Sequence, residues 1–301
     1  MAEDYKNQIF VFDVGGSHIA GGLFDPDTTT IGAIHTVPLR ETVTAEEFLA
    51  AFDSLGKTVA PGSVASSGVA VAIPSPFDYE RGVSYMQHKY HQLYGRNLRQ
   101  GLAERLACEP AKVHFLNDAA AFLMGELYQG AAVGVHRAIG ITLGTGVGSA
   151  FGVDGEIVVT GCGVPVGGEI WNLPYCDSSV ENFISTRSIR RRYEQLAGKR
   201  VEVREIANLG FEHAPTRQTF EDFGSELGNV LRNICLEFAP RRIVLGGGIS
   251  RAAPLFLPAA EKELAHPGIQ LRVSDLFERA PLIGAGVRWM RNNLKWQAKQ
   301  A

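Results

Sequence analysis

The sequence predicts an α/β protein built from two related halves. Two stretches, Ile9 to Asp25 and Ile139 to Gly155, follow one plan: an apolar run of β type, a turn of glycines with a hydroxyl residue, and a second apolar run ending near an aspartate. The two copies begin roughly one domain length apart. The chain of 301 residues is long enough for one large or two medium domains.

The two glycine turns have the chemistry of a phosphate site. Glycines let a ligand approach the backbone closely, and the exposed N–H groups of such a turn form a concave anion site. Asp13, at the end of the first strand, is placed to hold a hydrated Mg²⁺ beside bound phosphates. An ordinary glycine-rich hairpin remains the alternative for the first turn alone. The hydroxyls of Ser17 and Thr145 at equivalent points favour the phosphate interpretation.

The pattern differs from the dinucleotide-binding fingerprint, because that motif opens a helix after its glycines. Here the sequence continues as a strand after the second turn, from Val147 to Val153. The third turn, at 246–248, also follows a strand, but it leads into a helix from about Ala252. A nucleoside can lie against such a glycine backbone without meeting a side chain.

The remaining elements are predicted from apolar periodicity, capping residues and turn residues. Between the two hairpins we expect a strand over 30–38, a helix from Thr44 to about Leu55, a strand over 67–73, a long aromatic loop over 77–95, a helix over 97–106, a strand over 113–116 and a helix over 119–127. Beyond the second hairpin we expect a helix starting at 177–181, a helix over 220–238, a strand over 241–245, and, within 282–296, a Gly-Ala-Gly turn and a terminal helix.

Asp118 stands at a junction between a predicted strand and a predicted helix. An acid at this point can simply cap the helix. It can also act as a general base, because ligands collect at the carboxyl edge of the sheet in α/β folds. Both roles are compatible with one side chain.

Composition excludes several classes of function. The formal net charge is −3, with basic and acidic residues mixed, so no stripe or tail indicates nucleic acid. No apolar run approaches the length of a membrane span, and the polar N-terminus carries no apolar signal region. None of the four cysteines forms a CxxC pair, so we expect reduced thiols, as in the cytoplasm.

Five motifs occur in order along the chain: Asp13-Val-Gly-Gly-Ser17, Asn117-Asp118, Leu143-Gly-Thr-Gly-Val-Gly148, Gly168-Glu169 and Leu245-Gly-Gly-Gly248. Each is weak alone, but the ordered set, spread over nearly the whole chain, resembles the ROK family of repressors, open reading frames and sugar kinases. The resemblance implies the two-domain actin-like ATPase (ribonuclease H-like) fold, in which each domain is a mixed β-sheet with flanking helices and the active site lies in the cleft. The implied domains are 1–119 and 120–285, with a C-terminal helix at about 286–301 packing back on the first. The segment before Ile9 is too short for a helix-turn-helix, which favours the kinases over the repressors.

The resemblance also implies roles for individual residues. Two phosphate loops and an adenosine loop would bind ATP through Gly15, Gly16, Ser17, His18, Gly144, Thr145, Gly146, Gly246, Gly247 and Gly248. The implied sugar site comprises Ser75, Asn117, Asp118, Glu169, Asn172 and Glu181. Asp118 would be the catalytic base, and Asp13 would hold Mg²⁺ through water.

The chain departs from the family pattern mainly where the sugar is bound. Ser75 replaces a glycine, Asn172 replaces a histidine, and Lys89 falls near the place of a sugar-binding Asn. At the first phosphate loop Ser17 replaces threonine, and His18 replaces the common lysine. The cysteine cluster of the family's zinc site is missing, so we predict no structural zinc.

The predicted activity is transfer of the γ-phosphoryl group of ATP to a hydroxyl of a hexose or hexose derivative, with closure of the two domains excluding water. The sugar stays open among glucose, fructose, mannose, allose and N-acetylated hexosamines, and polyphosphate stays open as a donor. One alternative is a non-catalytic sugar sensor or scaffold, which would not need Asp118 or the phosphate turns. Another is an ATPase acting on a non-sugar partner, against which Glu169 and Glu181 argue. A homodimer is compatible with the family.

Overall fold

The computed structural model of the chain describes residues 7–61, 67–87 and 89–300, with side chains described through residue 293 of the last helix. The chain divides into two compact units, Met1–Tyr128 with Glu278–Ala301, and Gln129–Phe277. The sequence placed the boundaries at 119 and 285. The first unit extends further because the helix that starts at Asp118 packs against the C-terminal helix, with Gly125 against the backbone of Ala280.

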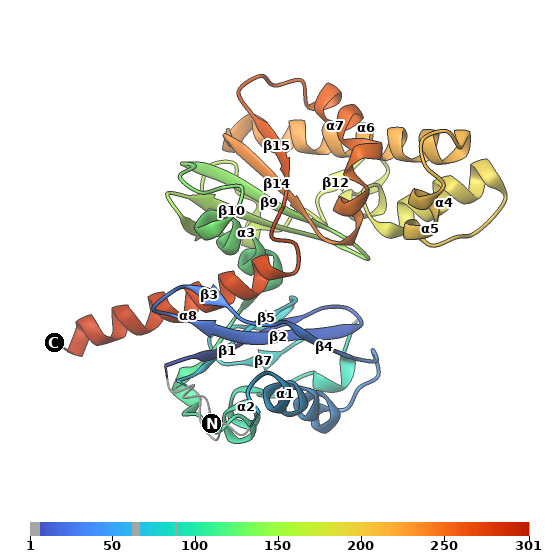
Figure 1. Cartoon of the computed structure of the whole chain (residues 1–301). Helices are drawn as coiled ribbons and strands as arrows, with labels where there is room; N and C mark the ends of the chain where they lie inside the picture. Colours follow the sequence, from blue (N-terminus) through green and yellow to red (C-terminus); the bar gives the residue numbers. More distant parts are fainter. Residues whose placement is uncertain (1–6, 62–66, 88, 301) are drawn as a thin grey trace. The chain divides into compact units, whose positions relative to one another are not determined.

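The first unit holds a six-stranded mixed sheet in the order β3-β2-β1-β5-β8, with β4 also paired to β2 (Figure 1). Strands β1, β5 and β8 are parallel, and β2 runs antiparallel to β1, β3 and β4. Its strands are β1 (Ile9–Val14), β2 (His18–Asp25), β3 (Thr30–Ile31), β4 (His35–Pro38), β5 (Val69–Ile73) and β8 (Val113–Asn117). The expected loop over 77–95 contains a small hairpin, β6 (Phe77–Asp78) with β7 (Val83–Ser84), and the short 3-10 helix η1 (His91–Leu93).

Helices cover both faces of this sheet, which is why β1 is a continuous apolar run. Helices α1 (Ala45–Val59) and α2 (Arg99–Arg105) lie on one side of the sheet and α8 (Arg279–Gln300) on the other (Figure 1). The predicted capping box is confirmed: the Thr44 hydroxyl accepts from the N–H of Glu47 at 3.2 Å, and the Glu47 carboxylate accepts from the N–H of Thr44 at 2.8 Å. The remaining helical segments are η2 (Pro110–Lys112) and α3 (Asp118–Gln129).

The second unit repeats the pairing pattern of the first. Its five-stranded sheet has the order β11-β10-β9-β14-β15, in which β9, β14 and β15 are parallel and β10 is antiparallel to β9 and β11. The strands are β9 (Arg137–Leu143), β10 (Val147–Val153), β11 (Glu156–Val158), β14 (Arg242–Gly246) and β15 (Gln270–Val273). The predicted duplication is therefore confirmed for five strands of each sheet, and β4 of the first unit is an addition.

The helices of the second unit pack aromatic side chains onto its sheet. Phe220 and Phe223 of α6 and Phe256 of α7 share one core with Ile141 and Leu245 of the strands. The helical segments are η3 (Val166–Gly168), η4 (Val180–Asn182), α4 (Thr186–Ala197), α5 (Val203–Asn208), α6 (Ala214–Phe238), η5 (Gly248–Ala252) and α7 (Ala253–Leu264). In the part of the chain that is described, no helix combines the length and the apolar character needed to cross a membrane.

Three predictions of local structure are wrong. The single strand expected over 30–38 is two short strands, β3 and β4, each paired with β2. The helix expected to start at 177–181 is instead a hairpin of β12 (Pro174–Tyr175) and β13 (Ser178–Ser179) followed by η4, because Asp and Ser serve turns as well as helix caps. The expected Gly-Ala-Gly turn at 284–286 lies inside α8. There the glycines allow close approach, Gly284 to the backbone of Ala121 in α3 and Gly286 to the ring of Phe24. The terminal helix is otherwise as expected; residue 301 lies outside the described residues.

Replacing Gly284 by Ala tests this contact between α3 and α8. A methyl group there would overlap the carbonyl oxygen of Ala121, so the helices must move apart. We expect the free energy of unfolding to fall by about 1–3 kcal/mol, the usual cost of overpacking, despite the better helix propensity of alanine. Denaturant unfolding measures this. Gly32→Ala is the matched control, since its methyl would meet only the Leu23 carbonyl at 3.8 Å; equal stability of the two variants would contradict the packing described.

Candidate active site

The carboxyl ends of three parallel strands bring four predicted site residues to one edge of the first sheet. Asp13 of β1 is level with Ala72 of β5, and Ile73 of β5 is level with Asn117 of β8. Ser75 follows β5 by two residues, and Asp118 follows β8 directly. Ligands of open α/β sheets bind at this edge, so the structure collects these residues where the sequence placed the reacting groups.

The side-chain amide of Asn117 caps helix α3, so the cap role considered for Asp118 is filled by its neighbour. The Asn117 side-chain oxygen accepts from the N–H of Ala120 at 3.0 Å, the bond expected of a cap. Its NH₂ group donates to the Tyr79 hydroxyl at 3.4 Å. Asp118 accepts the nearer N–H of Ala119, at 2.9 Å, through one carboxylate oxygen. The helix therefore does not need Asp118 as its cap.

Asp13 and Asp118 influence one another electrostatically. Burial first, and then the negative charge of Asp118, raise the pKa of Asp13 from 3.8 to about 7. The Asp13 side chain lies deep among protein atoms, although part of it still reaches solvent. A buried acid with a raised pKa favours the arrival of a cation, and perturbed acids are typical of functional sites.

The first glycine turn joins β1 to β2 and is fixed from three sides. The Gly15 N–H donates to the His18 carbonyl at 2.9 Å, and the Tyr90 hydroxyl donates to the Gly15 carbonyl at 2.6 Å. The Leu39 N–H donates to the Ser17 carbonyl at 2.8 Å. Ser17 and His18 are exposed, with Ser17 Oγ 3.4 Å from His18 Nδ1. Within the described residues, the N–H groups of Gly16 and Ser17 have no acceptor, as a backbone anion site requires.

The second glycine turn, over 144–146, is closed by Glu181. The Gly144 N–H donates to the Gly146 carbonyl at 3.0 Å, and the Gly144 carbonyl accepts the N–H of Thr186 at 2.8 Å. Glu181 Oε2 accepts the N–H of Val147 at 3.1 Å, and its Oε1 is 3.3 Å from the Arg187 guanidinium. A Cβ on Gly146 would lie 2.7 Å from Glu181 Oε2, so a larger residue would displace this carboxylate from the turn. The acid predicted to bind sugar is thus also a structural part of the second glycine turn.

Trp171 connects the two acids of the second unit. Its indole N–H donates to Glu169 Oε2 at 2.9 Å, and its carbonyl accepts the N–H of Glu181 at 3.0 Å. The loop itself is held by Ser149, whose hydroxyl donates to the Gly168 carbonyl at 2.6 Å and accepts the N–H of Ile170 at 3.0 Å. Asn172, the residue after Trp171, is exposed. Glu169, Asn172 and Glu181 are therefore presented by one segment of the second unit.

The glycine turn after β14 carries the predicted adenosine loop. Gly247 has φ 80°, and a Cβ there would overlap the backbone of Leu143, so this position requires glycine. The Ser250 hydroxyl donates to the Gly247 carbonyl at 2.7 Å and fixes the turn. Gly248 faces open space, with no atom within 4 Å of an added Cβ. The close approach of Gly247 to Leu143 places this loop beside the end of β9, where the second glycine turn begins.

Metal ligation is not evident from side-chain clusters. Over the described residues, no group of three or more His, Cys, Asp or Glu side chains is arranged to hold a metal ion. Cys162 and Cys176 are exposed free thiols. Mg²⁺ at Asp13 and the absence of structural zinc stay predictions.

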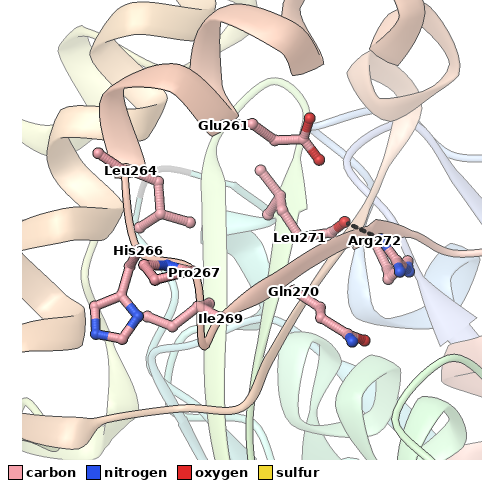
Figure 2. Close-up of a pocket in the computed structure, with 9 residues that line it drawn as sticks. Glu261, Leu264, His266, Pro267, Ile269, Gln270, Leu271 and Arg272 are labelled. Atoms are coloured by element: carbon pink, nitrogen blue, oxygen red, sulfur yellow. Dashed lines mark hydrogen bonds between the residues drawn. The ribbon is translucent and has the colours of Figure 1, made fainter.

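A separate hollow of about 420 Å³ lies where α7 leads into β15 (Figure 2). Figure 2 shows His266, Pro267 and Ile269 on the connecting loop and Arg272 with its guanidinium bonded to the Leu271 carbonyl at 3.2 Å. The loop enters β15 at Gln270, the amino end of the strand. The hollow contains none of the predicted site residues, and it lies at the edge of the sheet opposite to that used for ligands.

Four residues at these positions were missed from sequence: Tyr79, Tyr90, Trp171 and Arg187. The aromatic loop over 77–95 was a signal for the two tyrosines, but spacing could not show which hydroxyl meets which strand end. Trp171 stands in the Gly-Glu-Ile-Trp-Asn segment, next to residues already singled out. Arg187 was hidden within a run of basic residues that is typical of a solvated helix face.

Comparison with known proteins decides the family. The sequence model of the ROK family matches residues 10–290 of this chain. The chain belongs to the ROK family. Its relatives include the glucokinase of Thermotoga maritima, 25% identical over 93% of this chain and 96% of that protein. The N-acetyl-D-glucosamine kinase of Citrobacter koseri is 27% identical over 85% of this chain and 88% of that protein.

Solved structures of ROK proteins confirm the predicted fold. The ROK glucokinase of Streptomyces griseus, crystallised with glucose and AMPPNP, superimposes with a TM-score of 0.80 at 21% identity and covers 93% of this chain and 98% of that one. A ROK transcriptional regulator, a homologue of the E. coli MLC protein, has a TM-score of 0.77 at 17% identity, with 94% of this chain and 78% of that one covered. The names of the curated ROK relatives bear out the predicted enzyme class, a phosphotransferase with a carbohydrate hydroxyl as acceptor.

Proposed function

We propose that this ROK protein transfers the γ-phosphoryl group of ATP to a hydroxyl of a hexose or hexose derivative, with Asp118 as general base. The observation that carries the proposal is that two interacting acids, Asp13 and Asp118, lie at one sheet edge, with Asp13 next to the last residue of β1, the strand that enters the first glycine turn. A fold alone does not define a reaction. The base and the anion-binding backbone supply the two parts that phosphoryl transfer requires.

In the proposed reaction the sugar oxygen attacks phosphorus as its proton passes to Asp118. A carboxylate suffices because positioning and charge stabilisation dominate in a loose transition state. Asn117 on the first unit, and Glu169 and Glu181 on the second, would orient sugar hydroxyls; hydrogen bonds to charged acceptors are strong and discriminating. The N–H groups of the glycine turns would hold the phosphates.

The donor set at the first sheet edge fits Mg²⁺. Asp13 is an oxygen ligand whose ionised form is disfavoured without a cation, and Asp118 adds a second negative charge nearby. Mg²⁺, when bound with ATP, would neutralise phosphate charge.

A cytoplasmic location and a homodimer are part of the proposal. The four cysteines, Cys108, Cys162, Cys176 and Cys235, are all free thiols.

A sugar panel tests the proposal. ADP release is followed with ATP and Mg²⁺ in the presence of glucose, mannose, fructose, allose, N-acetylglucosamine, N-acetylmannosamine and N-acetylgalactosamine, each compared with a blank lacking sugar. We expect ADP only with sugar, and phosphorylated sugar in equal amount. ADP release independent of sugar would instead indicate an ATPase. Polyphosphate in place of ATP examines the donor.

A sugar-binding regulator is the second candidate, because a ROK transcriptional regulator shares the fold. A regulator needs a sugar site but no catalytic base. Sugar binding by calorimetry, with no ADP released for any sugar in the panel, would favour it.

A further inference from the structure

The side chain of Lys89, which belongs to the aromatic loop over 77–95, ends beside the first glycine turn. A Cβ built on Gly16 would lie 3.4 Å from Lys89 Nζ and 3.8 Å from its Cε. Lys89 is half-buried rather than directed freely into solvent. Its ammonium therefore faces the turn whose Gly16 and Ser17 N–H groups have no acceptor among the described residues.

The next residue anchors this arrangement. Tyr90 is fully buried, its ring packs against Phe48 with centroids 5.6 Å apart, and its hydroxyl donates to the Gly15 carbonyl at 2.6 Å. Burial, with a smaller contribution from Glu41, raises the pKa of Tyr90 to about 12, so this hydroxyl keeps its proton and stays a donor at neutral pH. The backbone beside Lys89 is therefore tied to the turn that its ammonium covers.

Hydrogen-bond donors border the space between Lys89 and the turn on both sides. The ammonium offers three N–H bonds and no acceptor, and the turn offers backbone N–H groups. No carboxylate lies within 4.0 Å of Lys89 Nζ in the described part of the chain, so an ion pair does not occupy the cation. An anion between these donors would satisfy both sides, and a tetrahedral phosphoryl group has oxygens for each.

We propose that Lys89 is a catalytic residue that binds the terminal phosphoryl group of the donor from the side opposite the Gly16–Ser17 backbone. The inference rests on the proposed function. As the sugar oxygen forms its bond to phosphorus, the bond from phosphorus to the β–γ bridging oxygen breaks and nucleoside diphosphate leaves. The hydroxyl proton goes to Asp118. Lys89 keeps its own protons and donates hydrogen bonds to an equatorial phosphoryl oxygen throughout.

The sequence placed Lys89 near a sugar contact, so the experiment separates phosphate from sugar. Affinities for ATP and for ADP, each with Mg²⁺ and without sugar, are measured by calorimetry for wild type, Lys89→Met, Lys89→Arg and the control Lys57→Met. Lys57 is an exposed surface lysine of the same unit, 2.7 Å from Asp53. Thermal melting of each variant establishes that it folds.

We expect Lys89→Met to weaken ATP binding about 10–100-fold, the worth of a charged hydrogen bond, and ADP binding less than about twofold. In the steady state its kcat falls while the sugar KM is kept. Lys89→Arg should recover most of the ATP affinity, and Lys57→Met should resemble wild type.

Three results would overturn the inference: equal losses for ATP and ADP, unchanged ATP affinity, or a raised sugar KM as the main effect. The binding measurements do not depend on turnover. Wild-type protein inactive with every sugar, but with the selective ATP loss in Lys89→Met, would refute the kinase proposal and leave the phosphoryl contact standing.

Discussion

Asp118→Asn is expected to lower kcat by about 10²–10⁴-fold while sugar binding is largely kept. That range is the usual contribution of a positioned general base. Asn has nearly the shape of Asp and can still accept the N–H bond from Ala119 that Asp118 makes. It cannot take up the hydroxyl proton during transfer. Steady-state kinetics with the preferred sugar measure kcat, and calorimetry measures the sugar affinity.

Asp78→Asn is the matched control for this variant. Asp78 belongs to the same unit, is level with Val83 in the small β6–β7 hairpin, and lies 3.9 Å from the guanidinium of Arg81. Its loss should leave kcat within about twofold, as expected for an exposed pair of this kind. Unchanged kcat in Asp118→Asn would remove this carboxylate from the role of base. A large rise in sugar KM with kcat kept would make it a binding residue only.

The parts of the fold that follow from local sequence were predictable. The capping box of α1 lies within four residues, and each glycine hairpin within a single stretch, so neighbours along the chain determine them. The duplicated pairing followed from the two similar stretches. Asp118 stood out because a strand ends and a helix begins there.

Other features depend on residues far apart in sequence. Tyr90 meets Gly15, and Lys89 meets Gly16, only because the aromatic loop folds back on the first turn. From sequence, Gly284 was interpreted as part of a turn. Its actual role is to let α8 approach α3 closely, and the local sequence does not contain that information. Trp171 contacts both Glu169 and Glu181, and the spacing of these residues in the sequence does not predict these contacts.

Asp13→Asn is expected to raise stability at pH 8 and to abolish the stabilising effect of Mg²⁺. Burial and the charge of Asp118 raise the folded-state pKa of Asp13 to about 7, above its ordinary value of 3.8. The folded state therefore binds the Asp13 proton more tightly than the unfolded state does. Between about pH 4 and pH 7 ionisation progressively opposes folding, and above pH 7 the whole penalty applies. Asn carries no charge, so its advantage should be largest at pH 8 and disappear near pH 4.

Mg²⁺ should act on wild type in the opposite sense. A cation that binds the ionised carboxylate stabilises the folded state by mass action, so added Mg²⁺ should raise the melting temperature at pH 8 and have little effect at pH 5. Thermal melts over this pH range, with and without Mg²⁺, measure both effects.

Asp25→Asn is the control, because the pKa of Asp25 is shifted in the opposite direction to that of Asp13. Burial, the largest single effect on Asp25, acts to raise its pKa, but the hydrogen bonds from Asp27 and Thr28 together outweigh it, and the pKa is lowered. The ionised form of Asp25 is thus the favoured one, and this variant should lose a little stability at pH 8 while keeping the response to Mg²⁺.

If Asp13→Asn were no more stable than wild type at pH 8, ionisation of Asp13 would not oppose folding. If the variant still responded to Mg²⁺, the cation would bind elsewhere. The expected combination, a more stable but metal-insensitive protein, would indicate that the first sheet edge retains an unfavourable charge because phosphoryl transfer requires it.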